Sequence, residues 1–411
     1  MLSFLLEQKY LGRIYMLLFA MILINPLLSM FVPVTTILRS MELLCYIGIF
    51  FYLNKLRKHG NLRHLGLYEQ VLYIMLLFIT VGILVRGEWP NTPKDFALHL
   101  LVTPTYLLPF IIVLLPNVKH FDYIVHLFFK VSLWVVPIWL LNLPSLVQVS
   151  YKAESIGVAL PFLSAFLLGI NNRFTKRQQW ISLIIWAIYF FLMMLNARRN
   201  TSFTLLLYAF IAYMFLMSSS VKRHKLKAIF LIFVSIISGL MLCLNFESLT
   251  SGLFRSMADR AMEDTRSGVE ELFFLDFANA PKTDWIFGRG MDGGYYQIMV
   301  DKETGEINDN RTGIETGYLN MMLKGGIVYN VVVILIMLLA VEHGYGRRNR
   351  TYSFLTTILL TYFIDLYTNN PVCAFSVRSI LFWFCISVLS ANAPMLKLSQ
   401  LIKNGKRSSL Y

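Results

Sequence analysis

Two adjacent arginines, Arg198 and Arg199, lie between the apolar runs 179–196 and 201–218. Each run is about as long as a helix must be to cross a bilayer, so the pair lies at or just within a membrane surface. Charge at that depth is costly and is usually functional. The planar guanidinium donates two parallel hydrogen bonds and keeps its charge, which suits it to phosphate. An outward-facing pair could therefore hold a phosphate or pyrophosphate group.

Four further residues could act on the same surface. Arg266 and Arg289 fall in a long hydrophilic segment, and Arg311 and Glu315 stand where the next apolar run begins. A helix that starts by Arg311 would put Arg311 and Glu315 one turn apart, within reach of an ion pair. For each single arginine, the alternative is a solvated or headgroup-bound charge.

Asp365 and Arg378 lie within the last two apolar runs, at similar distances in sequence from Pro371, which marks the turn between them. With a helical rise of ~1.5 Å per residue, both lie ~10 Å below the surface. Equal depth on adjacent antiparallel helices predicts an ion pair. Either the two charges only neutralise each other, or Arg378 faces a cavity and binds an anion.

The whole chain has the composition of a membrane protein. It has 411 residues, of which 57% are hydrophobic and 15% charged, and its mean hydropathy is +0.61. Apolar runs of about 17–25 residues recur along it. We predict an all-α fold, a polytopic bundle of about 12 transmembrane helices. The expected spans are 14–34, 40–56, 68–86, 96–116, 128–148, 155–171, 179–196, 201–218, 227–246, 315–341, 352–369 and 372–392.

Lysine and arginine set the orientation of these spans, because cytoplasmic loops carry an excess of them. With the N-terminus inside, the short outer loops hold only Arg39, Arg86, Lys94, Lys152, Arg198 and Arg199. Both termini are then cytoplasmic, and Arg198 and Arg199 face outside. The organisation is nine spans in 1–246, a periplasmic or extracellular loop at 247–314, three spans in 315–392, and a cytoplasmic tail at 393–411.

The outer loop 247–314 is either a disordered connector or a folded, partly helical cap. Residues 250–277 have helical spacing, 286–296 are rich in glycine and predict a tight non-helical element, and 301–311 are polar and turn-rich. This mixture of apolar, aromatic and glycine residues favours the cap, and long structured loops usually carry function.

Several functional classes are disfavoured. The four cysteines lie in or near predicted spans without paired spacing, and no metal pattern, nucleotide-binding loop or nucleic-acid motif is present. The net charge of +14 comes mainly from the predicted cytoplasmic face, where it suits anionic lipid. We expect no metal, no cofactor and no nucleic-acid partner.

The order of these features resembles the O-antigen polymerase and O-antigen ligase superfamily. A span ends in Asn196-Ala-Arg198-Arg199, and two spans later a large outer loop contains Asp264-Thr-Arg266-Ser. The element Phe287-Gly-Arg-Gly290 follows, and then the helix entry that begins at Glu315. The resemblance covers residues 150–345 best. Ligases carry a catalytic histidine in the loop, but this chain has none in 247–314, which favours a repeat-unit polymerase.

The resemblance implies a metal-independent glycosyltransferase in the bacterial cytoplasmic membrane. Its substrate would be an oligosaccharide on undecaprenyl pyrophosphate, destined for O-antigen (lipopolysaccharide), capsule or exopolysaccharide. Arg198, Arg199, Arg266, Arg289, Arg311 and Arg378 would hold pyrophosphate or glycan, and Asp365 would pair with Arg378. Glu315 is the candidate catalytic base, with a structural salt bridge to Arg311 or a helix N-terminal charge as the alternative.

Other readings remain open. The chain could be a ligase that transfers glycan to lipid A core, a flippase for lipid-linked oligosaccharide, or a membrane scaffold. A flippase would not need the outer loop and would be expected to show an internal repeat. Expected partners are the lipid-linked substrate and membrane lipids, with a chain-length regulator and a flippase of the same pathway as further candidates.

Overall fold

A computed structural model describes residues 2–28, 35–58, 62–87, 105–141, 161–195, 199–218, 267–300, 307–347 and 349–391. Helices take up 80% of the described residues and strands 3%, so the fold is mostly helical, as the sequence predicts. The predicted span 227–246, the tail 393–411, Arg198 and Arg266 lie outside these residues.

The described helices coincide with most of the predicted apolar runs, but several ends differ: the helix expected from 14 begins at Leu2, and the one expected from 128 begins at Phe121. A short apolar helix also covers Thr105–Leu114. The helices outside the large loop are α1 (Leu2–Leu28), α2 (Thr35–Lys58), α3 (Leu67–Val85), α5 (Phe121–Leu141), α8 (Pro161–Gly169), α9 (Lys176–Leu195), α10 (Arg199–Ser218), α16 (Gly317–Tyr345), α17 (Arg350–Thr368) and α18 (Val377–Ser390), with a 3-10 turn η1 at Asn171–Arg173.

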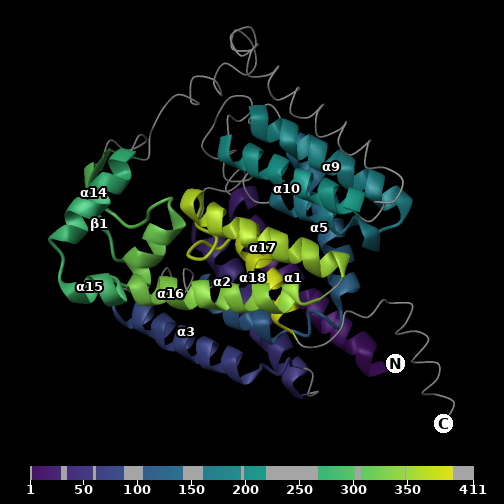
Figure 1. Cartoon of the computed structure of the whole chain (residues 1–411), viewed down its shortest axis with the longest axis horizontal. Coiled ribbons are helices and arrows are strands. Elements are labelled where there is room, and N and C mark those ends of the chain that lie inside the picture. The colour runs from purple at the N-terminus through teal and green to yellow at the C-terminus, as the bar shows by residue number, and fades with distance from the viewer. Residues whose placement is uncertain are drawn as a thin grey trace, which may run out of the picture.

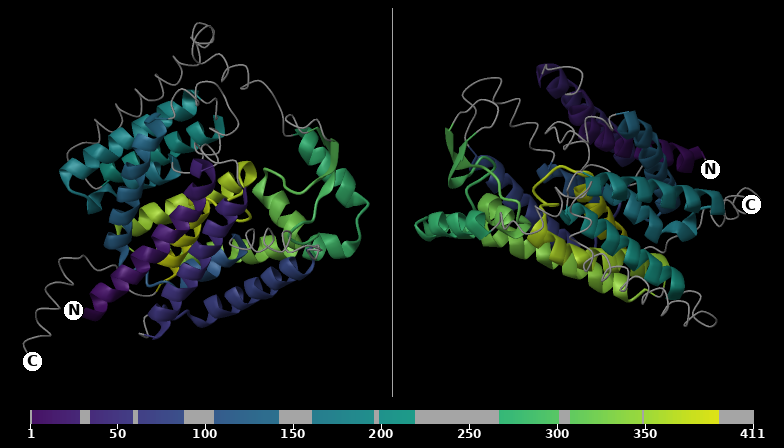
Figure 2. Two further views of the ribbon diagram at one scale, coloured as in Figure 1. Left: turned by 180° about the vertical axis from the view of Figure 1, so that it is seen from behind. Right: turned by 90° about the horizontal axis from the view of Figure 1, so that it is seen from above.

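The helices pack around α18, whose residues are all buried. A helix that is apolar all round belongs in the interior, and α18 contacts both α16 and α17. Helix α3 runs alongside α16, and α9 and α10 pack together on the other side of the bundle (Figure 1). The green elements that follow α10 in the described chain form a separate outgrowth at one end (Figure 2).

This outgrowth, which we call the cap, comprises residues 267–300 and 307–311. It contains α14 (Ser267–Ala278), α15 (Lys282–Phe287) and an antiparallel pair of strands, β1 (Tyr295–Val300) and β2 (Ile307–Arg311). In the register of the pair, Tyr295 stands opposite Arg311. Phe273, Phe277 and Tyr295 of the cap form a small hydrophobic core together with Met322 and Leu323 of α16. The helix predicted within 250–277 is present from Ser267 onward. The polar stretch 301–311, which the sequence predicts to form turns, contains β2, so the all-α prediction is wrong for this segment.

The helix bundle has two ends, one that carries the cap and one opposite to it. At the cap end, α16 begins beside the turn after α17: a Cβ atom on Gly317 would lie 2.4 Å from the Asn369 carbonyl oxygen. At the opposite end, Arg63 pairs with Glu69 at 2.6 Å and donates to the Ser387 carbonyl at 3.0 Å. Arg63 thus links the start of α3 to the end of α18 at the side of the bundle away from the cap.

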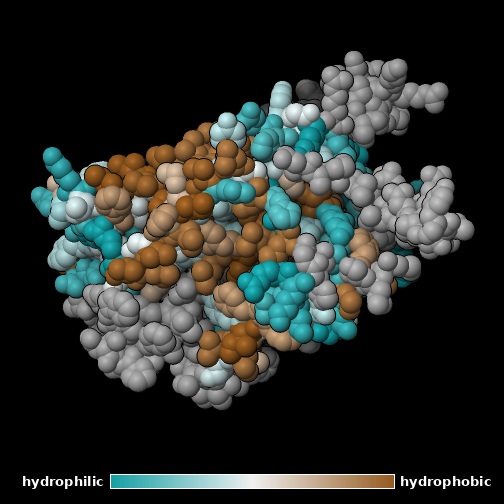
Figure 3. All heavy atoms as spheres, turned by 90° about the horizontal axis from the view of Figure 1, so that it is seen from below, coloured by the Kyte–Doolittle hydropathy of each residue, from teal (hydrophilic) through white to brown (hydrophobic). Residues whose placement is uncertain are grey.

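Two described helices, α3 and α16, are long and apolar enough to cross a membrane by length and composition. On α3, large apolar side chains such as Phe78 and Val81 are exposed. Apolar side chains gather over a broad part of the face seen from below, the side on which α3 lies in Figure 1, and hydrophilic side chains gather toward the cap (Figure 3). These features suggest association with a membrane.

Candidate functional site

The cap is joined to the bundle at a break in α16. Gly326 has φ 72° and ψ −169°, so the helix is interrupted there. A break leaves carbonyl groups without helical donors. The cap supplies them: the backbone N–H of Arg289 donates to the Leu323 carbonyl at 2.7 Å, and that of Gly290 to the Lys324 carbonyl at 3.1 Å. The Phe287–Gly290 element therefore completes the interrupted helix.

Two glycines of this element allow the close approach. Gly288 and Gly290 have φ values of 69° and 87°, a region that L side chains rarely adopt. A Cβ atom on Gly288 would lie 2.4 Å from the carbonyl carbon of Lys324, and one on Gly290 would lie 2.6 Å from that of Arg86. The glycine-dense segment thus fits between the break in α16 and the end of α3. It is the tight non-helical element that its sequence predicts.

Lys324 of α16 bonds to the backbone of the glycine-dense loop. Its buried ammonium donates to the Met291 carbonyl at 2.7 Å and to the Gly293 carbonyl at 2.9 Å. The Met291 N–H in turn donates to the Ile83 carbonyl of α3 at 3.0 Å. The loop is consequently bonded to both α3 and α16, which fixes the position of the cap over this end of the bundle.

Arg289 holds the parts of the cap together. Its guanidinium contacts the carboxylate of Asp276 in α14, donates through Nε to Asp284 Oδ2 in α15 at 3.1 Å, and reaches the Gly294 carbonyl at 2.7 Å. It also lies over the Phe277 ring, 4.7 Å from the centroid. The charge of Arg289 is thus balanced within the cap, and its position ties both helices to the loop before β1.

Arg311 lies at the end of β2 in a small polar group. Its Nη1 donates to Gln297 Oε1 at 3.0 Å and its Nε to the Gly313 carbonyl at 3.0 Å. The Tyr295 hydroxyl donates to the same Gln297 oxygen at 2.9 Å. Burial raises the pKa of Tyr295, while the neighbouring Arg311 acts to lower it and the charge of Glu315 to raise it. Arg311, Tyr295 and Glu315 are therefore electrostatic neighbours.

The helical turn expected between Arg311 and Glu315 is absent. Arg311 ends a strand that pairs with β1, Thr316 is the N-cap of α16, and the helix begins at Gly317. No ion pair between Glu315 and Arg311 occurs among the described residues. Glu315 is exposed immediately before the N-terminus of α16, where the helix dipole favours a negative charge. Its carboxylate is open to an approaching group.

Asp365 and Arg378 form an ion pair inside the bundle, with Nη1 and Oδ1 3.2 Å apart and side-chain exposures of 5% and 7%. The Arg378 guanidinium lies 3.5 Å from the centroid of the Phe162 ring, and the Tyr362 hydroxyl donates to the Arg378 carbonyl at 3.1 Å. Arg378 Nη2 is buried without a hydrogen-bond partner in the described part of the chain. The pair links α17, α18 and α8.

Removing one charge of this pair should destabilise the protein strongly. A buried charge without its partner costs about 3–5 kcal/mol, whereas removing both charges is often nearly neutral. We expect Asp365→Asn to lower the thermal unfolding temperature of the purified protein markedly, and Asp365→Asn with Arg378→Met to recover most of the loss. A double variant as unstable as the single one would contradict this account.

The predicted arginine cluster is only partly within the described residues. Arg289 and Arg311 both lie in the cap, each with its own hydrogen-bond partners, and α10 begins at Arg199. Arg378 lies within the bundle, near the turn at the cap end. Nothing here bears on Arg198 or Arg266, which lie outside the described ranges.

Sequence reasoning passed over three residues near the site. Lys324 is a lone charge in an apolar run beside Gly-Gly, which could have indicated a broken helix. Arg86 is one of the few basic residues predicted in the short outer loops, and its Nη2 lies 3.3 Å from Asp284 Oδ1. Glu270 accepts a hydrogen bond from the Thr316 hydroxyl at 2.6 Å, which puts a second carboxylate beside Glu315; only spatial proximity identifies it.

Among the described residues, no group of three or more His, Cys, Asp or Glu side chains could hold a metal ion. The site is thus a set of arginines and carboxylates at the junction of the cap with α3 and α16. Neither the known protein families nor the curated proteins contain a match to this chain.

Proposed function

We propose that the chain is a metal-independent membrane glycosyltransferase that polymerises repeat units carried on undecaprenyl pyrophosphate. It would act at the outer face of the bacterial cytoplasmic membrane, as a multi-pass protein with both termini cytoplasmic. The product would be O-antigen, capsule or exopolysaccharide. Its partners would be the lipid-linked substrate and membrane lipids, with a chain-length regulator and a flippase of the same pathway.

The observation that carries the proposal is the junction of the cap with the break in α16. Four backbone and side-chain hydrogen bonds from Arg289, Gly290 and Lys324 fix the cap there. A rigidly held cap supports a catalytic role, because transfer reactions depend on the exact placement of groups. The cap holds Arg311, and with it the segment that leads to Glu315, at the same end of the bundle as Arg86.

The chemistry follows from these groups. A hydroxyl of the acceptor sugar attacks the anomeric carbon of the donor, the bond from that carbon to the pyrophosphate oxygen breaks, and its electron pair leaves with the pyrophosphate. The hydroxyl proton passes to a carboxylate, for which we propose Glu315, a role worth about 10²–10⁴-fold. Arginines stabilise the charge on the leaving group. Arg311, Arg198, Arg199 and Arg266 are proposed for this, with Arg378 deeper in the bundle.

In this proposal Arg289 contributes mainly by holding the cap, because its guanidinium already contacts two carboxylates. A pyrophosphate that replaced them would have to break contacts between α14 and α15. Arg311 bonds only neutral acceptors among the described residues, which supports it over Arg289 as a ligand for pyrophosphate.

The proposal is tested with the purified full-length protein and lipid-linked repeat units. A ladder of lengthened glycans would support the polymerase. Transfer to lipid A core without lengthening would instead indicate a ligase, and movement across the bilayer without new bonds would indicate a flippase.

Arg198 and Arg199 provide a separate prediction. Arg198→Ala or Arg199→Ala should abolish polymer while the amount of protein in the membrane stays normal, because the leaving pyrophosphate loses a charged partner. Arg177→Ala, at the opposite end of α9, is the matched control and should polymerise normally. If both variants made the wild-type amount of polymer, Arg198 and Arg199 would be ordinary surface charges with no role in catalysis.

A further inference from the structure

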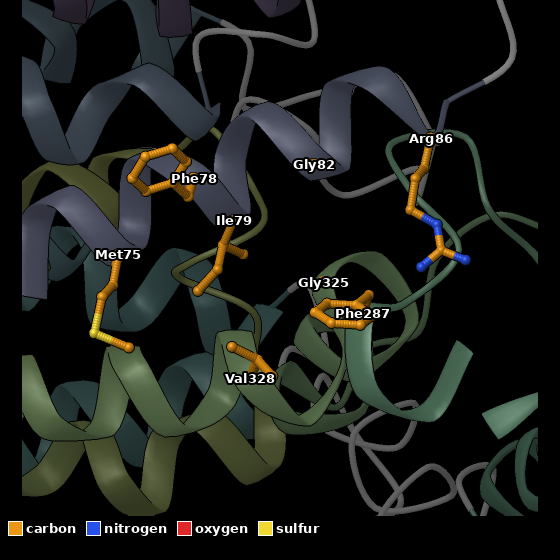
Figure 4. A pocket seen from close by; sticks show the side chains of 8 residues that line it. All are labelled: Met75, Phe78, Ile79, Gly82, Arg86, Phe287, Gly325 and Val328. Carbon is orange, nitrogen blue, oxygen red and sulfur yellow. The ribbon is translucent and has the colours of Figure 1, made fainter. Parts of the chain in front are cut away.

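An apolar groove lies between α3 and α16, beside the break in α16 (Figure 4). Its volume is about 430 Å³, within the range of small-molecule pockets. Met75 and Phe78 line it from α3 and Val328 from α16, and Phe287 of the cap closes one end. Arg86 is the only charged residue among those that line it.

The groove faces the apolar exterior of the molecule. Among the described helices, its two are those long and apolar enough to cross a membrane, and Phe78 on its rim is 73% exposed. Side chains of this kind on such helices contact lipid tails when the protein lies in a bilayer. The natural occupant of the groove is therefore a hydrocarbon chain and not a water-soluble molecule.

Arg86 gives the groove a charged end. Its side chain extends from the end of α3 toward Phe287 (Figure 4). The guanidinium forms an ion pair with Asp284 Oδ1 at 3.3 Å and reaches the Thr283 carbonyl at 3.4 Å, both long contacts, and the side chain is 34% exposed, so an anion can still approach it. A groove that is apolar along its length and cationic at one end is complementary to a lipid with an anionic head.

The middle of the groove is kept open by glycine. A Cβ atom added to Gly82 would meet no atom within 4 Å, so the α3 side of the groove has free space at this position. Gly325, on the opposite wall, also lacks a side chain. A hydrocarbon chain can therefore lie against the backbone of both helices.

We propose that this groove binds the first isoprenoid units of a polyprenyl pyrophosphate lipid, with Arg86 against the pyrophosphate. The identity of the lipid rests on the proposed function, whereas the groove and its charged end are features of the fold. The lipid would then enter from the bilayer between α3 and α16 and present its pyrophosphate beside α15 of the cap.

The test is a binding measurement on the full-length protein in lipid nanodiscs, with labelled undecaprenyl pyrophosphate as the probe and phosphatidylglycerol as the competitor. In Gly82→Leu the new side chain fills the groove, and leucine in place of a helical glycine favours the helix. Val81→Leu, at a neighbouring exposed position outside the groove, is the matched control. Arg86→Gln removes the charge and keeps most of the side-chain length.

We expect Gly82→Leu to weaken binding of the probe at least tenfold, Arg86→Gln to weaken it several-fold, and Val81→Leu to leave it unchanged. Wild-type binding in Gly82→Leu would overturn the proposal. Equal competition by phosphatidylglycerol would overturn it too, since the groove would then take any anionic lipid. Because binding needs no turnover, a protein that binds the probe in this way without elongating glycan would refute the proposed function and leave this site standing.

Discussion

Replacing Gly326 by alanine is expected to reduce glycan elongation by about 10²-fold while the helix bundle stays folded. The residue has φ 72°, and a Cβ atom there would lie 2.1 Å from the Ile286 carbonyl oxygen of the cap. The backbone would have to leave the left-handed region or push α15 away, and a displacement of ~1 Å of catalytic groups can cost about this much in rate.

Two measurements test Gly326→Ala: hydrogen exchange of residues 282–293, and glycan elongation by the purified protein. Exchange in the cap should rise, while exchange in α17 and α18 should not change. Gly268→Ala in α14 is the matched control, because its Cβ atom would meet nothing within 4 Å. Elongation at the wild-type rate in Gly326→Ala would show that cap docking is not needed for activity.

Replacing Glu315 by glutamine should lower the elongation rate by about 10²–10⁴-fold, the usual contribution of a general base. Glutamine keeps the size and hydrogen-bonding capacity of the side chain but cannot take up the hydroxyl proton. The affinity for lipid-linked substrate should therefore remain close to that of the wild type. Single-turnover elongation and substrate binding are the two measurements.

Two other carboxylates serve as comparisons. Glu271→Gln, exposed on α14, should have no effect on elongation. Glu270 accepts a hydrogen bond from Thr316, next to Glu315, so Glu270→Gln tests whether the second carboxylate takes the role. A large loss in Glu270→Gln with normal elongation in Glu315→Gln would assign the base to Glu270.

The helices were largely predictable because long apolar runs leave few alternatives to a buried or membrane-embedded helix. The apolar run at 68–86 is a helix at Leu67–Val85, and the run at 352–369 is a helix at Arg350–Thr368. The ends were less predictable because caps set them: α17 starts after Asn349, whose side chain accepts from the Thr351 N–H. The helix expected from 155 is described from Pro161, and proline suits the first turn of a helix.

The cap was harder to predict because its local sequence contradicts its structure. Ile307–Arg311 is rich in asparagine and aspartate, which are uncommon in strands, and it is a strand through its pairing with β1. The same pairing removes the helical turn expected at Arg311 and Glu315. This pairing depends on both strands of the hairpin together, so the residue pattern of Ile307–Arg311 alone does not reveal it.

Within the site, charges were easier to locate than their partners. The positions of Asp365 and Arg378 around Pro371 were enough to suggest that they meet. The partners of Arg289, by contrast, come from α14 and α15, and the acceptors of Lys324 are backbone carbonyls of a loop. Such contacts depend on how the cap folds, and neither residue spacing nor charge count reveals them.

The central claim is that new glycosidic bonds form at the cap end of this protein. It is tested most directly in liposomes that contain the protein in one orientation, with lipid-linked repeat units supplied to one leaflet at a time. We expect lengthened glycan only from substrate in the leaflet next to the cap, with one undecaprenyl pyrophosphate released for each bond formed. Lengthening from the opposite leaflet, or the appearance of substrate across the bilayer without release of the carrier, would contradict it.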